Sequence, residues 1–471
     1  MISFLRIRLL SLLFLLFLAG GVSAQSLDLD QLLTEAEITG MSIAVIEDGR
    51  ISQLLNAGVR SSETQPPITD ETVFEAESLS KSVVAWIALR LIDEGTLDLD
   101  QSLAQLSPWE DAAHDSRYEQ ITTRMVLSHT SGFPNFRVPG EPLPLLFDPG
   151  AFYTYSGEGF LFLQHVLEAI TYSSLEDLAR EYVFEPFGMT SSSFVWQNDY
   201  GSRIAVGHTD MDVPLDKFVP QQANAALSLH TTASDYVRFV LGVIEGEDLG
   251  RRQYREMMVA QVDALDGIFW GLGWGLQPTI NGSALWEWGD NAGYKSFAWL
   301  APDASKGFVM LSNSANGMLV LHELFEAFVG GPQTSVRWLN YERYDDAVYQ
   351  LSRRLQYAQQ NGGIEAVRTD YEVAKSEMPA EAFVETALNA LGYRLLRRGA
   401  IEESIEVFRF NTELYPRSGN VFDSLAEALL ASGDMQAALD NYETSVRLDP
   451  GNENGVGMIQ VIEARLAAEE Q

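Results

Sequence analysis

Phe74-Glu75-Ala76-Glu77-Ser78-Leu79-Ser80-Lys81 contains the one Ser-x-x-Lys sequence of the chain. It opens residues 78–94, where apolar residues recur with helical period, so Ser78 and Lys81 are predicted to share one helical face. A serine hydroxyl becomes a nucleophile when a neighbour takes its proton, and a buried lysine can do this whereas an arginine cannot. Lysine is rare here, at five against 26 arginines. The two residues are a candidate catalytic pair, although a solvated helix end explains the spacing nearly as well.

Strand-like segments lie on both sides of the predicted helices. Residues 41–47 and the segment from Arg50 form a predicted hairpin around Asp48-Gly49, and residues 296–300 and 307–312 are further predicted strands. Helical periodicity also covers residues 160–170 and 234–244. Strands at both ends with helices between them predict an α+β domain with a single antiparallel sheet. We expect this domain to end near Gly331-Pro332.

Other motifs follow Ser78 and Lys81 in a characteristic order. They are Leu127-Ser128-His129-Thr130-Ser131-Gly132, Asp148-Pro149-Gly150 followed by Tyr153 to Phe160, Phe187-Gly188-Met189-Thr190, Ser228 to Phe239, and Trp286 to Tyr294. Together they resemble the serine β-lactamase and penicillin-binding-protein superfamily, and its class C β-lactamase, esterase and D-peptidase branch in particular. The resemblance covers residues 27–331. It implies a β-lactamase-like antiparallel sheet flanked by helices, together with an all-helical domain.

The resemblance also implies roles for individual residues. Ser78 would be the acylated nucleophile, Lys81 its proton partner and Tyr155 a second acid/base group, with Tyr153 as the local competitor for that role. The backbone N–H groups of Ser78 and Asp290 would form the oxyanion hole, because fixed donors stabilise the developing negative charge. His129 is expected to be architectural.

Four residues are expected at the substrate: Gly157, Glu287, Trp288 and Gly289. Two of them depart from the branch. Gly157 stands where the branch usually has an asparagine that helps hold β-lactams, so β-lactamase activity is in doubt. Glu287 stands where the branch usually has lysine or histidine. An anion there would repel a substrate carboxylate, which predicts an ester, an amide or an N-terminal D-amino acid as substrate.

The last ninety residues carry a different pattern. Apolar, small, aromatic and proline positions recur 34 residues apart, as in Leu391/Leu425, Leu395/Leu429, Gly399/Gly433, Phe408/Tyr442 and Pro416/Pro450. This period resembles the tetratricopeptide family, although any pair of helical hairpins remains an alternative. The predicted organisation is a hydrolase domain at 25–335, a helical linker at 336–380 and helical repeats at 381–471. A protein partner is possible at the repeats.

Composition excludes several classes of function. The 471 residues carry a formal net charge of −35, which argues against nucleic-acid binding because phosphate backbones would be repelled. The chain has no cysteine, and its six histidines form no zinc motif, so neither a metal site nor a cofactor is expected.

The N-terminus predicts the compartment. Arg6 and Arg8 precede an apolar run, and Val22-Ser23-Ala24 ends the segment with small residues. This pattern is typical of a secretory signal peptide over residues 1–24, which predicts a periplasmic or secreted protein without a stable membrane span after cleavage.

Two functions remain open from the sequence. The first is an exported serine hydrolase that forms an acyl-enzyme on a small-molecule or peptide substrate. The second is a catalytically impaired relative that binds a component of the cell envelope through its helical repeats. The retention of Ser78, Lys81 and Tyr155 together favours the enzyme.

Overall fold

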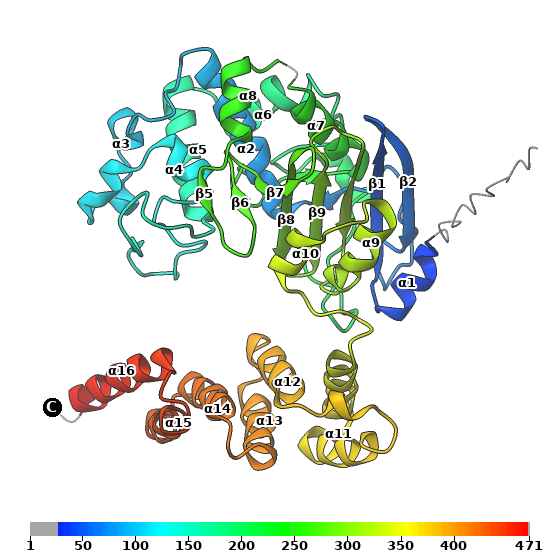
Figure 1. Ribbon diagram of the computed structural model, residues 1–471, viewed down its shortest axis with the longest axis vertical. Coiled ribbons are helices and arrows are strands. Elements are labelled where there is room, and N and C mark those ends of the chain that lie inside the picture. The colour runs from blue at the N-terminus through cyan, green and yellow to red at the C-terminus, as the bar shows by residue number, and fades with distance from the viewer. Residues whose placement is uncertain (1–26, 247, 470–471) are drawn as a thin grey trace, which may run out of the picture.

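The computed structural model describes residues 27–246 and 248–469. The predicted signal peptide therefore lies outside the described residues. Within them, the chain forms a sheet domain followed by a separate stack of helices (Figure 1). None of the helices in these two ranges combines the length and apolar character needed to cross a bilayer.

One eight-stranded antiparallel sheet organises the front domain, in the order β2-β1-β10-β9-β8-β7-β6-β5. Its strands are β1 Gly40–Glu47, β2 Arg50–Gly58, β5 Val262–Asp263, β6 Phe269–Trp270, β7 Gly275–Thr279, β8 Gly282–Asn291, β9 Tyr294–Leu300 and β10 Lys306–Ser312. The antiparallel pairing of β1 with β10 joins the two ends of the domain, with Met41 opposite Ser312. This confirms the α+β fold and the single sheet. A separate two-stranded ribbon pairs β3 Phe74–Glu75 with β4 His230–Thr231.

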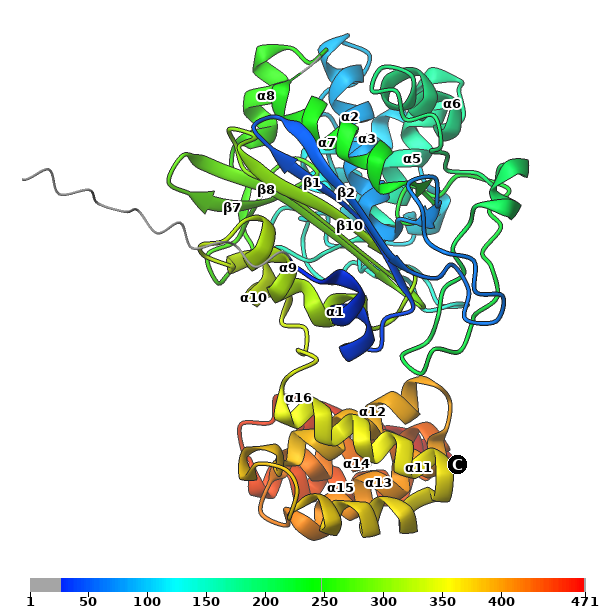
Figure 2. The ribbon, with the colours of Figure 1, turned by 90° about the vertical axis from the view of Figure 1, so that its right-hand side faces the viewer.

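Helices cover both faces of the sheet (Figure 2). They are α1 Leu29–Glu35, α2 Ser80–Asp93, α3 Leu103–Leu106, α4 Thr123–Leu127, α5 Gly157–Thr171, α6 Leu175–Ala179, α7 Ala233–Glu245, α8 Arg251–Met258, α9 Leu321–Phe328 and α10 Thr334–Leu339. Alternate residues of β1 point to opposite faces: Ala44 and Ile46 belong to the core that includes α2 and α7, while Met41, Ile43 and Val45 belong to the core that includes α1 and α9. Because both faces are buried, β1 is apolar along nearly its whole length.

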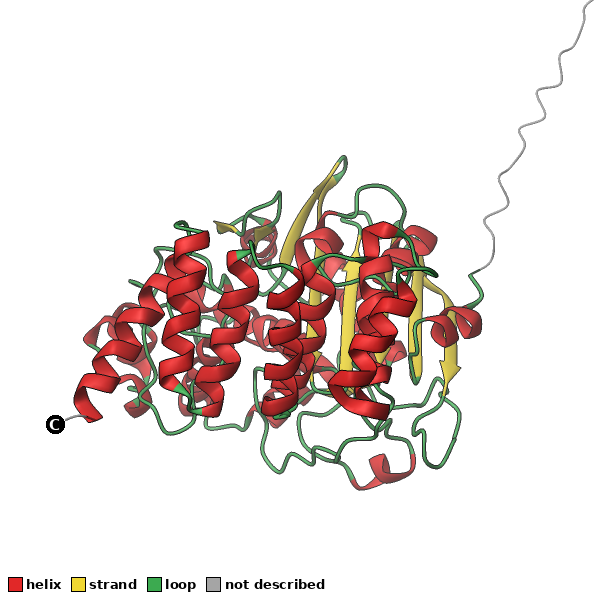
Figure 3. Ribbon diagram, turned by 90° about the horizontal axis from the view of Figure 1, so that it is seen from below, coloured by secondary structure: helices red, strands yellow, loops and turns green. Residues whose placement is uncertain are grey.

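The C-terminal helices stack in sequence. They are α11 Ala347–Ala374, α12 Glu385–Arg397, α13 Ile401–Leu414, α14 Gly419–Ser432, α15 Met435–Leu448 and α16 Glu453–Glu469, and they lie side by side in a row toward the C-terminus (Figure 3). The starts of α12 and α14 are 34 residues apart, as are those of α13 and α15. α11 breaks at Gly362 and Gly363 and packs its buried Leu351 and Tyr371 in one core with α12 and α13. The helical region is thus present, and its tetratricopeptide identity stays a prediction.

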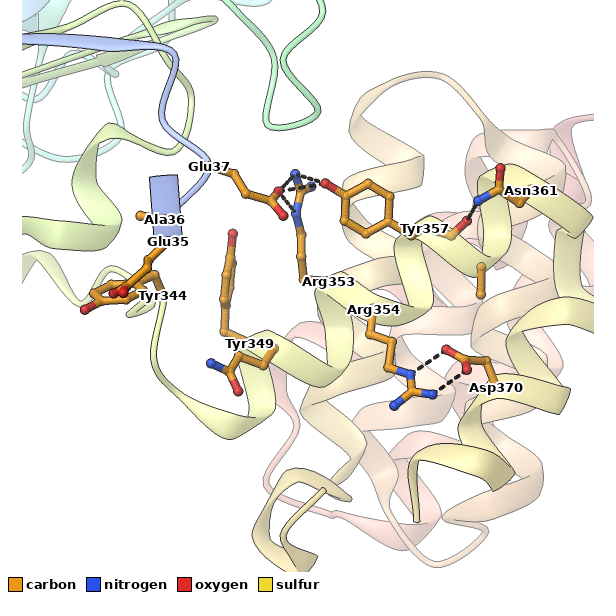
Figure 4. Close-up of a pocket in the computed structure, with 12 residues that line it drawn as sticks. Glu35, Ala36, Glu37, Tyr344, Tyr349, Arg353, Arg354, Tyr357, Asn361 and Asp370 are labelled. Atoms are coloured by element: carbon orange, nitrogen blue, oxygen red, sulfur yellow. Dashed lines mark hydrogen bonds and ion pairs between the residues drawn. The ribbon is translucent and has the colours of Figure 1, made fainter. Parts of the chain in front are cut away.

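Ion pairs hold the helical stack against the front domain (Figure 4). Arg353 of α11 is 7% exposed, and its Nε donates to Glu37 Oε2 at 2.8 Å. The Tyr357 hydroxyl donates to the same oxygen at 2.8 Å. Asp210 of the front domain pairs both with Arg353 and with Arg398, just after α12. The two parts therefore meet through specific polar contacts, and α12 lies close to the end of β8.

Candidate active site

Ser78 and Lys81 meet at the start of α2. Ser78 lies in the short 3₁₀ turn Glu77–Leu79, and Lys81 lies in the first turn of the helix that follows. Lys81 is fully buried; its Nζ donates to Ser78 Oγ at 2.9 Å and to the carbonyl oxygen of Ala226 at 2.9 Å. The Ala226 carbonyl, 145 residues away in sequence, therefore helps to aim the amine at the hydroxyl.

Burial changes the acidity of this amine. Removal from water disfavours the ammonium form and lowers the pKa of Lys81 to about 8, while the carboxylates of Glu287 and Glu77 partly oppose that fall. At pH 7 roughly a tenth of such amines would be neutral. Lys81 can thus accept a proton near neutral pH, which an exposed lysine cannot do efficiently.

Tyr155 lies beside the pair, just before α5. Its ring stacks on that of His129 with centroids 4.3 Å apart, and Lys81 Nζ lies 4.8 Å from its centroid. His129 Nδ1 accepts the Ser156 N–H at 2.9 Å, and burial lowers the pKa of His129 well below its ordinary value, so the ring is a neutral acceptor that positions this segment. Two causes raise the pKa of Tyr155 well above its ordinary value: burial is the larger, and the nearby charge of Glu287 is the next. Hydrogen bonding to Ser78 acts in the opposite direction.

Tyr153 occupies a different environment. Its ring packs against Trp270 and Trp338, and its buried hydroxyl has no hydrogen-bond partner among the described residues. The geometry therefore places Tyr155, rather than Tyr153, beside Lys81, whose Nζ lies 4.8 Å from the centroid of the Tyr155 ring.

Glu287 belongs to the same buried group. It lies in β8, has no exposed surface, and its Oε1 accepts the Tyr155 hydroxyl at 2.8 Å. Oε2 is buried without a hydrogen-bond partner in the part of the chain that the structure describes. Burial raises the pKa of Glu287 to about 8, and Lys81 acts against that rise. Glu287 is thus shielded from solvent and contacts Tyr155, and its direct contact with substrate stays a prediction.

The other three residues expected at the substrate have close protein neighbours, and their contact with substrate stays a prediction. A Cβ added to Gly289 would lie 2.7 Å from Glu77 Cβ and 2.8 Å from the Ala76 carbonyl oxygen, so its missing side chain makes room for protein atoms rather than for substrate alone. Trp288 is partly buried with its ring 4.6 Å from that of Tyr155. Gly157 is buried, and its N–H donates to Asn135 Oδ1 at 3.0 Å.

The end of β8 is tied to the segment that carries Ser78. The Asn291 side chain donates to Glu77, which adopts the left-handed conformation at φ 54°. A non-glycine residue in that region is uncommon, and this one comes directly before the candidate nucleophile. The Asp290 side chain turns away to Lys295 at 2.5 Å and to the Tyr341 hydroxyl at 2.5 Å. The oxyanion role of the Ser78 and Asp290 N–H groups stays a prediction.

Sequence reasoning missed several of these partners. The only indication of Glu77 in the sequence was its position as an acidic residue directly before Ser78. The carbonyl of Ala226 and the side chain of Asn135 gave no signal, because they reach the site only through the fold. In the two described ranges, no three His, Asp or Glu side chains are arranged to hold a metal ion.

Comparison with known proteins identifies the family. The profile of the beta-lactamase family matches residues 28–326, which is more than half of the chain and contains Ser78, Lys81, Tyr155 and Glu287. The chain belongs to the beta-lactamase family. The match ends before α11, so the family accounts for the front domain and not for the helical stack.

Individual members of the family show how distant the likeness is. Penicillin-binding protein 4 of Amycolatopsis lactamdurans is 26% identical over 343 residues, covering 64% of this chain and 87% of the relative. A beta-lactamase of Pseudomonas fluorescens is 24% identical, covering 53% and 72%. The D-alanine carboxypeptidase AmpC from Burkholderia cenocepacia superposes with a TM-score of 0.53 at 20% identity, over 61% of this chain and 91% of that one. The structural likeness shows the fold, and membership supports a serine hydrolase in general.

Proposed function

We propose that the protein is an exported serine hydrolase of the esterase or D-peptidase type, acting through an acyl-enzyme on Ser78. The observation that carries the proposal is the contact between Lys81 Nζ and Ser78 Oγ at 2.9 Å, made by an amine whose burial brings its pKa to about 8. A nucleophilic serine needs a neighbouring base that is neutral at working pH. Tyr155 completes the group as the second acid/base residue.

The expected reaction has two steps. Ser78 Oγ attacks the substrate carbonyl as its proton leaves, the bond to the leaving group breaks, and the departing oxygen or nitrogen receives a proton from Tyr155 or Lys81. Water then attacks the acyl ester, which restores the Ser78 hydroxyl and releases the acid. The N–H groups of Ser78 and Asp290 would stabilise the negative oxygen that forms in each step.

Glu287 gives this chain its own proton path. Because the Tyr155 hydroxyl donates to Glu287, Tyr155 can take a proton from Ser78 while its own proton passes to Glu287 Oε1. The phenol then never carries a full negative charge, which its buried surroundings would oppose. The proton returns by the same path when the leaving group departs.

The substrate class follows from the local charge. Glu77 directly precedes Ser78 and Glu287 accepts a hydrogen bond from Tyr155, so a carboxylate next to the scissile bond would meet negative charge as the pH rises toward 8 and these two groups ionise. We propose a substrate that is neutral or cationic at that point, such as an ester, an amide or an N-terminal D-amino acid.

A covalent probe tests the proposal. We expect a fluorophosphonate to add one label per chain, located at Ser78 by peptide mass, and Ser78→Ala to abolish it. Lys81→Ala should lose most labelling, and the double variant should lose little more, because the two groups act as one unit. An unlabelled wild-type protein, or an equally labelled Ser78→Ala variant, would overturn the proposal and favour binding through the helical stack. Export predicts that the mature protein begins at Gln25, which N-terminal sequencing checks.

A further inference from the structure

A cavity of about 760 Å³ opens where the end of β8 meets the helical stack. One wall is the turn from Asp290 to Gly293, whose first residue is the expected oxyanion donor. The opposite wall contains Arg394, Arg397 and Arg398. The front domain and the stack therefore both line this space, and Asp290 is the residue that it shares with the proposed reaction centre.

Basic residues dominate the charged lining of this cavity. Its charged members are the four cations Lys295, Arg394, Arg397 and Arg398 and the three carboxylates Asp210, Asp290 and Glu342. Lys295 pairs with Asp290, Arg394 with Glu342 and Arg398 with Asp210. The exposed Arg397 makes no ion pair with any residue that the structure describes, so the lining keeps one uncompensated positive charge in a chain of net charge −35.

The arrangement of the arginines directs them to one place. Residues 394, 397 and 398 are spaced i, i+3 and i+4, which puts their side chains on one face at the end of α12. Arg394 is 9% exposed, and its Nη1 donates to Ser352 Oγ at 2.7 Å, so it is fixed by its partners. Arg397 alone keeps its five donors available, and a guanidinium matches the geometry of a carboxylate.

We propose that this cavity binds a carboxylate carried by the substrate at a distance from the scissile bond, with Arg397 as its direct partner. The inference rests on the proposed function and refines its substrate class. Tyr341, Tyr349 and Leu319 line the same cavity and provide apolar surface for the chain that joins the carboxylate to the reacting carbonyl. The two charged regions then select substrates by position: negative charge is disfavoured beside Ser78 and favoured at α12.

A series of 4-nitrophenyl esters tests the proposal. Each neutral alkanoyl ester is paired with an ester of the same chain length that ends in a carboxylate, from the succinyl to the suberyl ester. We expect the wild-type preference, expressed as the ratio of kcat/KM for the carboxylate and neutral esters, to rise with chain length. Arg397→Ala should lower the ratio for the longest pair of esters roughly fivefold. Arg397→Glu should lower this ratio further, and Arg397→Lys should lower it less than Arg397→Ala does.

Controls separate this inference from the proposed function. Arg409→Glu changes an exposed arginine of α13 that lies outside the cavity and should leave the ratio unchanged. Fluorophosphonate labelling of Ser78, which needs no carboxylate, should proceed at the wild-type rate in every Arg397 variant. Two results would overturn this inference while leaving the proposed function intact, provided that neutral esters are hydrolysed. The first is a ratio that does not rise with chain length, and the second is a ratio that Arg397→Glu does not reduce. Absence of labelling and of all ester hydrolysis overturns both.

Discussion

Replacing Glu287 with glutamine should shift the pH dependence of Ser78 reactivity toward acid. Lys81 must be neutral to accept the Ser78 proton, so reactivity rises with pH through the pKa of Lys81, which is about 8. Burial lowers that pKa, and Glu287 is the larger of the two carboxylate contributions that hold it up, ahead of Glu77. Glutamine keeps the size of the side chain and can still accept a hydrogen bond from Tyr155, but it removes the charge.

The size of the shift follows from the loss of one opposite charge. A nearby full charge typically moves a pKa by one to three units. The pKa of Glu287 is itself about 8, so near that pH only about half of the Glu287 carboxyls are charged, and the pKa of Lys81 should fall by about half a unit to one unit. The assay is the second-order rate of fluorophosphonate labelling between pH 5 and 10, with Tyr153→Phe as a nearby aromatic control. We expect the rising limb to move to lower pH by about half a unit to one unit, whatever the change in the plateau rate. A limb that stays in place or moves to higher pH would refute the assignment of Lys81 as the base that Glu287 controls.

Three further outcomes follow from the same geometry. Tyr155→Phe should reduce ester turnover by about a hundredfold or more, as is usual for a general acid/base group. Tyr153→Phe should leave turnover nearly unchanged. A larger loss of turnover in Tyr153→Phe than in Tyr155→Phe would show that the wrong tyrosine was chosen. Gly289→Ala should lower the free energy of unfolding by about 1–3 kcal/mol in a denaturant titration, because the new Cβ meets backbone and side-chain atoms of the Ser78 segment; unchanged stability would contradict this. Burial raises the pKa of Glu77 from 4.5 to about 8, so the stability that its protonated form contributes is complete below pH 4.5 and is lost as pH rises through 8. The melting temperature should therefore fall less between pH 5 and 8.5 in Glu77→Gln than in the wild type. Melting temperatures that fall equally in both proteins would show that Glu77 does not cause the pH dependence.

The cavity beside α12 changes the expected role of the helical stack. If the stack only docked a partner, removing the chain after Leu388 would leave small-substrate hydrolysis intact. The structure instead places Arg394, Arg397 and Arg398 in the wall of a cavity that begins at Asp290. The stack thus forms part of the space next to the proposed active site, in addition to any surface it offers to a partner.

The sequence alone determined the fold class, the sheet that joins both ends of the front domain and the pairing of Ser78 with Lys81. These features depend on local sequence: the apolar run of β1, the helical period of α2, and a hydroxyl and an amine three residues apart. The short strands β5, β6 and β7 escaped prediction because two to five residues hold too little of a period to detect.

Only the tertiary structure decided how the site is built around that pair. Glu287 lies 132 residues from Tyr155, and only the fold buries its carboxyl group against the Tyr155 hydroxyl. Arg397 lies outside the family match, yet the fold brings it to the same cavity as Asp290. The physical reason is that burial, charge coupling and cavities depend on which distant segments pack together, and no local pattern in the sequence records that.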